Sequence, residues 1–116
     1  MSSTEDVLAA GDIDFAQLID IVKPMITGNP IRTDYGYTYD DGIWTITDCT
    51  LMDDWYVDDQ GLPLSQYRFC VSTEGPQRVQ LAKQAFDKLS AQTNLDLLWM
   101  SDMEILRDRR PALVAA

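Results

Sequence analysis

The chain has 116 residues, of which 46% are apolar, and it carries 19 acidic residues against 9 basic ones and no histidine. This composition fits one globular domain, and the net charge of −10 disfavours direct binding to nucleic acid or to an anionic membrane, because both require cations that face phosphate. The absence of histidine, with only two cysteines, excludes a structural zinc site and the usual histidine general bases.

The N-terminal part of the chain predicts a loose segment followed by a helix. Glu5 and Asp6 precede the first short apolar patch, whereas a secretory signal starts with basic residues, so we expect a cytoplasmic protein. Residues 1–12 are expected to be flexible or partly helical. Asp14 and Gln17 form a capping-box pattern that predicts a helix ending near Pro24.

A β-meander is predicted in the middle of the chain. Residues 33–39 alternate tyrosine with smaller or polar residues, which is typical of a strand with its tyrosines on one face. Asp40-Asp41-Gly42 suits a tight turn, and residues 43–51 are rich in β-branched and aromatic residues that return antiparallel. Residues 66–72 predict the third strand.

The last part of the chain predicts a long helix, a strand and a short helix. Proline at position 76 is typical of a first helical turn, and Thr93-Asn94 ends that helix. Residues 95–100 fit either a strand or a helix, and we expect a strand because Ser101 and Glu104 then cap a short last helix. Residues 111–116 are expected to be a frayed tail.

The resulting prediction is a single α+β domain over residues 13–110, in the order α-β-β-β-α-β-α. Its three- to four-stranded, mainly antiparallel sheet is expected to carry helices on one face.

Negative charge is concentrated in the first half of the chain. Residues 1–63 have a net charge of −11, residues 64–116 have a net charge of +1, and no Lys or Arg lies between Arg32 and Arg68. Eight aspartates fall in that interval: Asp34, Asp40, Asp41, Asp48, Asp53, Asp54, Asp58 and Asp59. Alternate residues of a strand lie about 6.6 Å apart on one face, similar to the spacing of phosphates along a nucleic acid. The aspartates therefore predict either a row of charge that imitates nucleic acid or simply a solubilising surface.

Aromatic residues lie among these aspartates. Trp44 and the tyrosine row are expected to pack against the helices, with a role as interface anchors as the alternative for the tyrosines, and core and interface are equally open for Trp55 and Tyr56. The candidate anchors are Tyr35, Tyr37, Tyr39, Trp55 and Tyr56. Rimmed by carboxylates, such rings suit arginine and lysine side chains of a partner.

Other kinds of site have weaker patterns. The acidic turns at 40–42 and 58–61 lack the ligand spacing of a calcium loop, so we expect no metal and no cofactor. No glycine-rich phosphate loop and no nucleophile with a neighbouring base is present, so we expect no catalytic residues. Cys49 and Cys70 are expected to be reduced and packed.

The run Arg107-Asp-Arg-Arg110 suits the cationic end of a helix, with a weak contact to another copy as the alternative. The function predicted from these patterns is non-catalytic binding and blocking of a basic protein or nucleic-acid-binding complex. The protein would then be an inhibitor or immunity protein, including phage-type inhibitors of host defence. The alternatives are a chaperone or adaptor for a client protein, and a small carboxylate- or metal-dependent enzyme.

Overall fold

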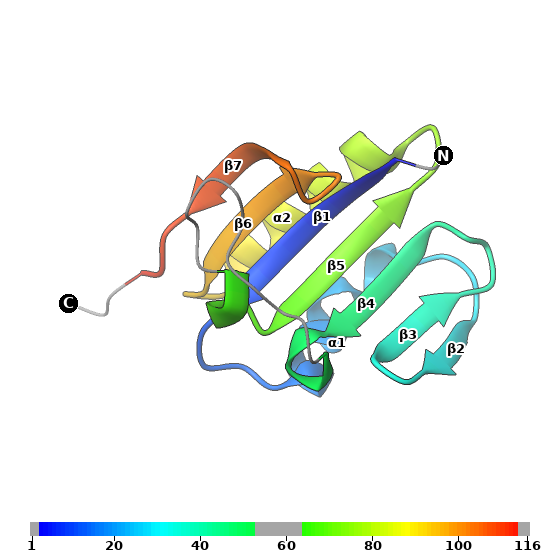
Figure 1. The fold of residues 1–116 in the computed structure, drawn as a ribbon, viewed down its shortest axis with the longest axis horizontal. Helices are drawn as coiled ribbons and strands as arrows, with labels where there is room; N and C mark the ends of the chain where they lie inside the picture. Colours follow the sequence, from blue (N-terminus) through cyan, green and yellow to red (C-terminus); the bar gives the residue numbers. More distant parts are fainter. Residues whose placement is uncertain (1–2, 53–63, 114–116) are drawn as a thin grey trace.

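A computed structural model describes residues 3–52 and 64–113 of the chain. Within these ranges the protein is a compact α+β domain with two α-helices and one seven-stranded antiparallel sheet, in the order β2-β3-β4-β5-β1-β6-β7 (Figure 1). The elements in chain order are β1 (Thr4–Ala10), α1 (Phe15–Val22), the 3-10 turn η1 (Lys23–Met25), β2 (Pro30–Thr33), β3 (Gly36–Tyr39), β4 (Trp44–Asp48), η2 (Cys49–Leu51), η3 (Leu64–Gln66), β5 (Phe69–Glu74), α2 (Arg78–Gln92), β6 (Asp96–Ser101) and β7 (Ile105–Arg110).

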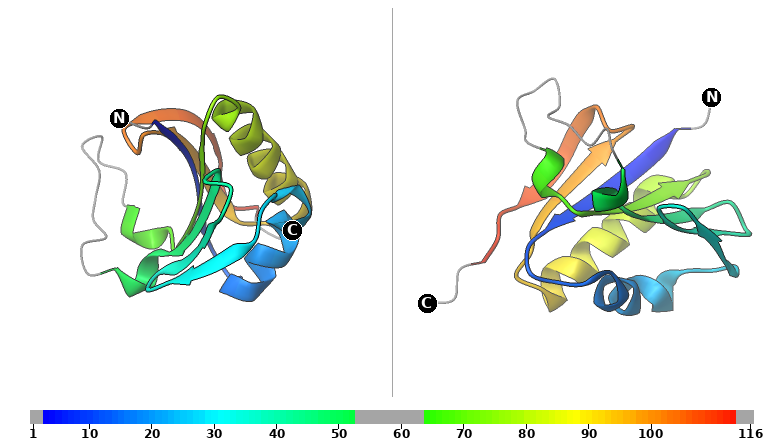
Figure 2. Two further views of the ribbon diagram at one scale, coloured as in Figure 1. Left: turned by 90° about the vertical axis from the view of Figure 1, so that its right-hand side faces the viewer. Right: turned by 60° about the horizontal axis from the view of Figure 1, so that its bottom comes forward.

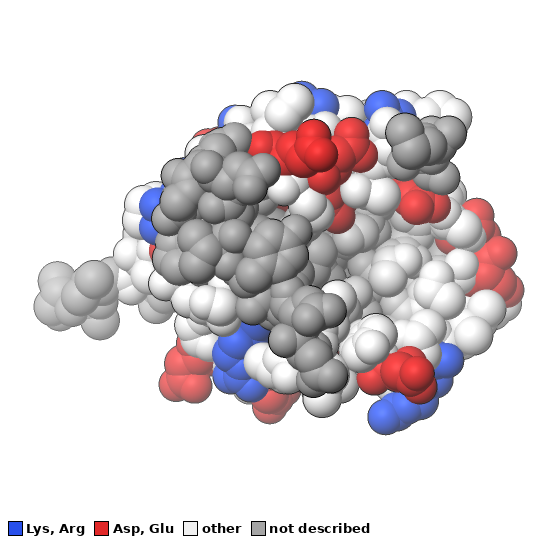
Figure 3. All heavy atoms as spheres, viewed as in Figure 1, with Lys and Arg blue, Asp and Glu red and all other residues white. Residues whose placement is uncertain are grey.

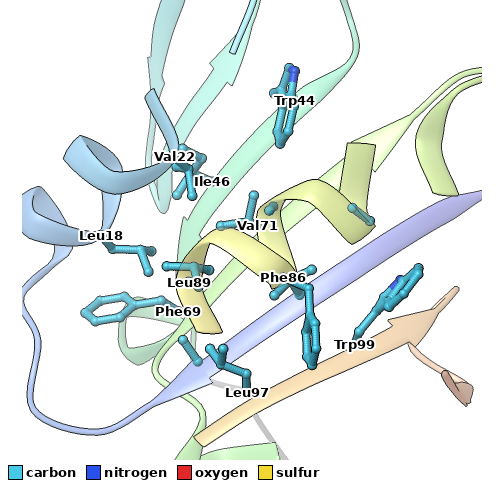
Figure 4. Packing of buried hydrophobic residues seen from close by; sticks show 14 of the residues in the cluster. Leu18, Val22, Trp44, Ile46, Phe69, Val71, Phe86, Leu89, Leu97 and Trp99 are labelled. Carbon is cyan, nitrogen blue, oxygen red and sulfur yellow. The ribbon is translucent and has the colours of Figure 1, made fainter. Parts of the chain in front are cut away.

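Both helices pack on one face of the sheet, as predicted, whereas η2 and η3 lie on the other side (Figure 2). The core under the helices is formed by one apolar stripe from each helix and by alternate residues of β1, β4, β5 and β6. Figure 4 shows how these side chains converge. The largest of them are Trp44, Phe69, Phe86 and Trp99.

Helix α1 begins where the capping box predicts. The Asp14 carboxylate accepts from the backbone N–H of Gln17 at 2.8 Å, and the Gln17 side chain accepts from the N–H of Asp14 at 3.0 Å. This pair satisfies two backbone donors that have no partner within the helix. The end of α2 at Gln92 and the strand after it are also confirmed.

The N-terminal prediction is wrong, because Thr4–Ala10 forms the strand β1 near the centre of the sheet and neither frays nor turns into a helix. Its two acidic residues are both buried, Glu5 on the face that carries α1 and α2 and Asp6 on the other. Because two of its seven residues are acidic, the segment lacks the apolar pattern expected of a central strand, so the strand was not predicted.

The predicted strand over residues 33–39 is two strands. The chain turns at Asp34-Tyr35, so β2 pairs with β3 as a hairpin. Gly36 at the start of β3 also allows β3 to lie close to β4, because its φ is +150° and a Cβ there would lie 2.2 Å from the backbone oxygen of Ile46 in β4. No other residue type allows the strands to approach so closely.

The predicted last helix is the strand β7 instead, so the observed order is β-α-β-β-β-β-α-β-β. Asp102 and Met103 adopt φ values of +53° and +59°, which turn the chain tightly back onto β6. Asp102 is fixed there because its backbone N–H donates to Thr4 and its carboxylate accepts from the N–H of Thr4 at 2.7 Å.

The two outer strands both carry features that discourage further pairing. Strand β2 starts with Pro30, which has no N–H to donate. Strand β7 exposes five of its six residues, and the backbone N–H of Arg109 donates to the carboxylate of Asp108 at 2.8 Å.

Candidate functional site

The predicted acidic residues that the structure describes lie at turns around β3 and β4. Asp34 is exposed in the β2–β3 turn, Asp40 and Asp41 are exposed in the β3–β4 turn, and Asp48 ends β4. Figure 3 shows acidic atoms at the right-hand edge of the molecule, over the β3–β4 turn. They cluster at turns and do not form a row along one strand. Asp53, Asp54, Trp55, Tyr56, Asp58 and Asp59 lie outside the described residues.

Asp40 and Asp41 hold the β3–β4 turn against the segment before β2. The Asp40 carboxylate accepts from the backbone N–H of Asn29 at 2.7 Å and from its side-chain amide at 3.0 Å. These hydrogen bonds keep the pKa of Asp40 below its usual value. Asp41 accepts from the hydroxyl of Thr27 and, at 3.0 Å, from the N–H of Ile43. The two carboxylates thus have a structural role and still face solvent.

Asp48 has a local role as well. Its carboxylate accepts from the backbone N–H of Thr50 at 3.1 Å and from the Thr50 hydroxyl at 2.5 Å, which caps the short turn η2.

The tyrosines do not form the single row that the sequence predicts. Tyr35 lies in the turn and is 46% exposed, whereas Tyr37 and Tyr39 are in β3 and face α1. The ring of Tyr37 stacks on that of Phe15, with 6.3 Å between their centroids. The guanidinium of Arg32 lies over the Tyr37 ring, 6.0 Å from its centroid. Trp44 is buried in the core, as expected.

A cleft of about 460 Å³ opens between α1 with η1 on one side and the β2–β3 hairpin on the other. Tyr37 and Tyr39 form part of its wall, and Asp20 and Lys23 supply its charged side chains. Its other lining residues are Ala16, Ile19, Ile26, Gly28 and Pro30. The sequence analysis missed Asp20 and Lys23, since only the packing of α1 beside the hairpin brings them to the tyrosines.

The Asp40–Asp41 turn lies directly beside this cleft. A Cβ added to Gly28, one of the lining residues, would lie 2.7 Å from a carboxylate oxygen of Asp40 and 3.0 Å from the carboxyl carbon of Asp41. The cleft therefore joins two of the predicted tyrosines to two of the predicted aspartates.

A second polar cluster surrounds Asp6 on the sheet face away from the helices. The Asp6 carboxylate is 3% exposed and accepts from the hydroxyls of Ser72 at 2.7 Å and Thr4 at 3.0 Å. Burial raises the pKa of Asp6, and the neighbouring Asp102 acts in the same direction. The hydrogen bond to Ser72 joins β1 to β5, so the cluster has a structural role.

Both cysteines are free and buried next to this cluster, as the sequence predicts. Burial raises the pKa of Cys49 to about 12 and that of Cys70 well above its usual value. A thiol with such a pKa is almost entirely protonated at neutral pH and is a poor nucleophile.

The arginines of β7 are all engaged within the domain. Arg107 pairs with the fully buried carboxylate of Glu5, which also accepts from Trp99 Nε1 at 3.2 Å and from the Ser101 hydroxyl at 2.6 Å. Arg109 pairs with Asp96 at 3.0 Å.

Arg110 binds the C-terminal end of α2. Its guanidinium donates to the backbone oxygens of Ser90 at 2.7 Å, Thr93 at 2.9 Å and Leu95 at 2.9 Å. The prediction that this run ends a helix of its own is wrong, because it lies in β7, and Arg110 complements the end of α2 instead.

No protein-family model, curated protein or solved structure matches this chain. Across residues 3–52 and 64–113, no helix has both the length and the apolar character needed to cross a membrane. In the same ranges, no three carboxylate or thiol residues come together in an arrangement that would hold a metal ion.

Proposed function

We propose that the protein is a non-catalytic binding protein that attaches to a basic macromolecular partner through its acidic, aromatic-rich surface in residues 34–59. In this proposal it covers and blocks that partner, as an inhibitor or immunity protein does. The partner is a basic protein, such as a nuclease or a component of a nucleic-acid-binding complex, and the encounter takes place in the cytoplasm.

One observation carries the proposal: the described aspartates of the β2–β3 and β3–β4 turns are exposed, while the arginines of β7 already have partners within the domain. The arginines of β7, at one edge, are taken up by Glu5, by Asp96 and by the end of α2. Near the other edge, the described aspartates of the β2–β3 and β3–β4 turns are exposed to solvent. The arginines of β7 already have partners, and Arg32 is the one basic residue between Lys23 and Arg68 in the sequence. A cation from another molecule is therefore a suitable partner for these carboxylates.

Electrostatic attraction of this kind acts mainly on the rate of association and weakens with salt. At about 0.15 M salt, charges separated by more than about 8 Å are largely screened, so only a surface that meets its partner closely retains binding. The exposed ring of Tyr35 beside Asp34 supplies an anchor for such close contact.

The test compares two charge-reversed forms of the protein as bait. Asp34→Lys with Asp58→Lys changes the proposed surface, and Asp12→Lys with Asp87→Lys changes exposed carboxylates elsewhere. Both double variants raise the net charge by four, from −10 to −6. Proteins captured from the native host's lysate are eluted with a salt gradient and quantified by mass spectrometry.

We expect one basic protein or complex to be retained by the wild type and by the Asp12/Asp87 control, and lost by the Asp34/Asp58 variant. Its purified form should then associate with the wild type more slowly as salt rises. A partner that both variants retain equally would refute the acidic surface. Clients that bind independently of salt would instead indicate a chaperone.

A further inference from the structure

The cleft between α1 and the β2–β3 hairpin has a largely buried tyrosine in its wall. Tyr39 is only 8% exposed, and burial raises the pKa of its phenol. A tyrosine in the wall of a cleft offers a ligand an apolar ring and a hydroxyl that can donate or accept a hydrogen bond.

The chemistry of the wall selects the kind of group that fits. Tyr37 and Tyr39 are two positions apart in β3, so both rings lie on the same side of the strand. Both tyrosines line the cleft, together with the apolar residues Ile19, Ile26 and Pro30. A planar cation on an apolar stem matches such a surface better than a small, strongly hydrated ion does.

The charges around the cleft favour a cation. Asp20 lines it, and the carboxylates of Asp40 and Asp41 lie beside Gly28 at its edge. Against these three carboxylates stand Lys23 in the lining and Arg32 over Tyr37. The carboxylates are in excess, and the position of Arg32 shows that the Tyr37 ring accepts a guanidinium.

We propose that this cleft receives an arginine side chain of the basic partner. The guanidinium lies against the tyrosine rings, donates to the Tyr39 hydroxyl and to the Asp20 carboxylate, and the aliphatic stem contacts the apolar residues. The cleft volume of about 460 Å³ is within the usual range of about 300–1,000 Å³ for ligand sites, which suffices for one side chain and adjoining backbone. This inference rests on the proposed function and specifies which group of the partner is recognised.

The first experiment uses a defined probe. N-acetyl-L-arginine amide is titrated into the ¹⁵N-labelled protein, and amide chemical shifts are followed by NMR. N-acetyl-L-citrulline amide, which has nearly the same shape without the charge, is the control. A single side chain binds weakly, with an expected Kd of about 1–10 mM.

We expect saturable shifts centred on Ala16, Asp20, Tyr37 and Tyr39, with the citrulline probe at least about fivefold weaker because it lacks the charge. Equal shifts with both probes, shifts spread over all acidic turns, or no saturable shift would each overturn the proposal.

Three variants test the contacts. Tyr39→Phe and Asp20→Asn should each weaken binding of the arginine probe by about three- to tenfold, since each removes one acceptor for the guanidinium. Lys23→Gln should strengthen it about two- to threefold by removing a repelling charge. An occupant with negative charge would reverse the effect of Lys23→Gln, and that reversal would overturn the proposal.

A fourth variant separates this inference from the proposed function. Ala16→Trp fills the cleft from an exposed helix position, and Ala91→Trp adds the same ring at an exposed position on α2. With the captured partner, Ala16→Trp should lower affinity at least about tenfold while Ala91→Trp leaves it unchanged. If Ala16→Trp has no effect and the Asp34/Asp58 reversal still abolishes binding, the arginine cleft is wrong and the acidic surface stands. If neither change matters, both are wrong.

Discussion

Replacing Arg110 should destabilise the domain more than replacing its neighbour Arg109, although both are arginines of the same outer strand. Arg110 is half-buried and donates hydrogen bonds to three backbone oxygens: Ser90 in the last turn of α2, Thr93 at its C-cap and Leu95 just beyond it. The last four carbonyls of a helix have no partner within it, so Arg110 supplies the Ser90 carbonyl with a donor that the helix itself lacks.

The magnitude follows from these contacts. At about 1 kcal/mol net for each hydrogen bond, with the carbonyls partly rehydrated after the change, Arg110→Met should lower the free energy of unfolding by about 3 kcal/mol. Arg110→Lys keeps the positive charge near the helix end but removes the planar guanidinium with its several donors, so we expect about half of that decrease in the free energy of unfolding. Arg109→Met removes an ion pair whose arginine is 39% exposed, which is typically worth less than about 1 kcal/mol.

Urea denaturation followed by tryptophan fluorescence measures these differences, because Trp44 and Trp99 are both buried in the core. With a denaturant slope of about 1.5 kcal/mol/M, Arg110→Met should move the midpoint down by about 2 M. A loss below about 1 kcal/mol, or one equal to that of Arg109→Met, would refute the structural role assigned to Arg110.

Three other predictions concern the glycines, the thiols and a buried carboxylate. Gly36→Ala should lower the free energy of unfolding by more than about 3 kcal/mol or prevent folding, because the new Cβ would overlap a backbone oxygen. Gly42→Ala, at φ +74° in open space, should lower it by about 1–2 kcal/mol. Similar midpoints in urea for the two variants would contradict this. Cys49 and Cys70, buried and protonated, should react with Ellman's reagent only as fast as the domain unfolds, and rapid labelling in native buffer would show the thiols to be accessible. Burial raises the pKa of Asp6, so its contribution to stability is full below the unfolded pKa of about 3.9 and is lost as pH rises through the higher folded pKa. The stability of the wild type relative to Asp6→Asn should therefore fall as pH rises above about 4, and a constant difference would be evidence against it.

The sequence was most informative where structure depends on neighbouring residues. The capping box of Asp14 and Gln17 placed α1 correctly, because both hydrogen bonds lie within one turn of chain. The turn before β4 and the end of α2 were predicted for the same reason. The packing of both helices on one face of the sheet was also predicted, but not which face carries them.

The sequence was misleading where a strand depends on distant partners. Glu5 and Asp6 make β1 look unlike a central strand, and each is accommodated only by residues far along the chain: Arg107, Trp99 and Ser101 for Glu5, and Ser72 for Asp6. For β7, the turn at Asp102-Met103 uses positive φ values without glycine, so no turn residue marked it.

The candidate site shows the same division. The aspartates and tyrosines of residues 34–48 could be identified from composition and spacing, but their arrangement could not. The hairpin turn at Asp34-Tyr35 separates Tyr35 from the two tyrosines that face α1. The cleft exists only because α1 packs beside that hairpin, and sequence spacing contains no information about that contact.

The outer strands of the sheet have a consequence for how any partner is recognised. An incoming peptide commonly adds itself to a sheet as one more strand, and is then held largely through main-chain hydrogen bonds that are indifferent to its sequence. Here β2, one outer strand, begins with Pro30, which has no N–H. In β7, the other outer strand, the backbone N–H of Arg109 already donates to the Asp108 carboxylate. We therefore expect this protein to discriminate among partners by their side chains, and to stay monodisperse at concentrations where a bare sheet edge would nucleate fibrils.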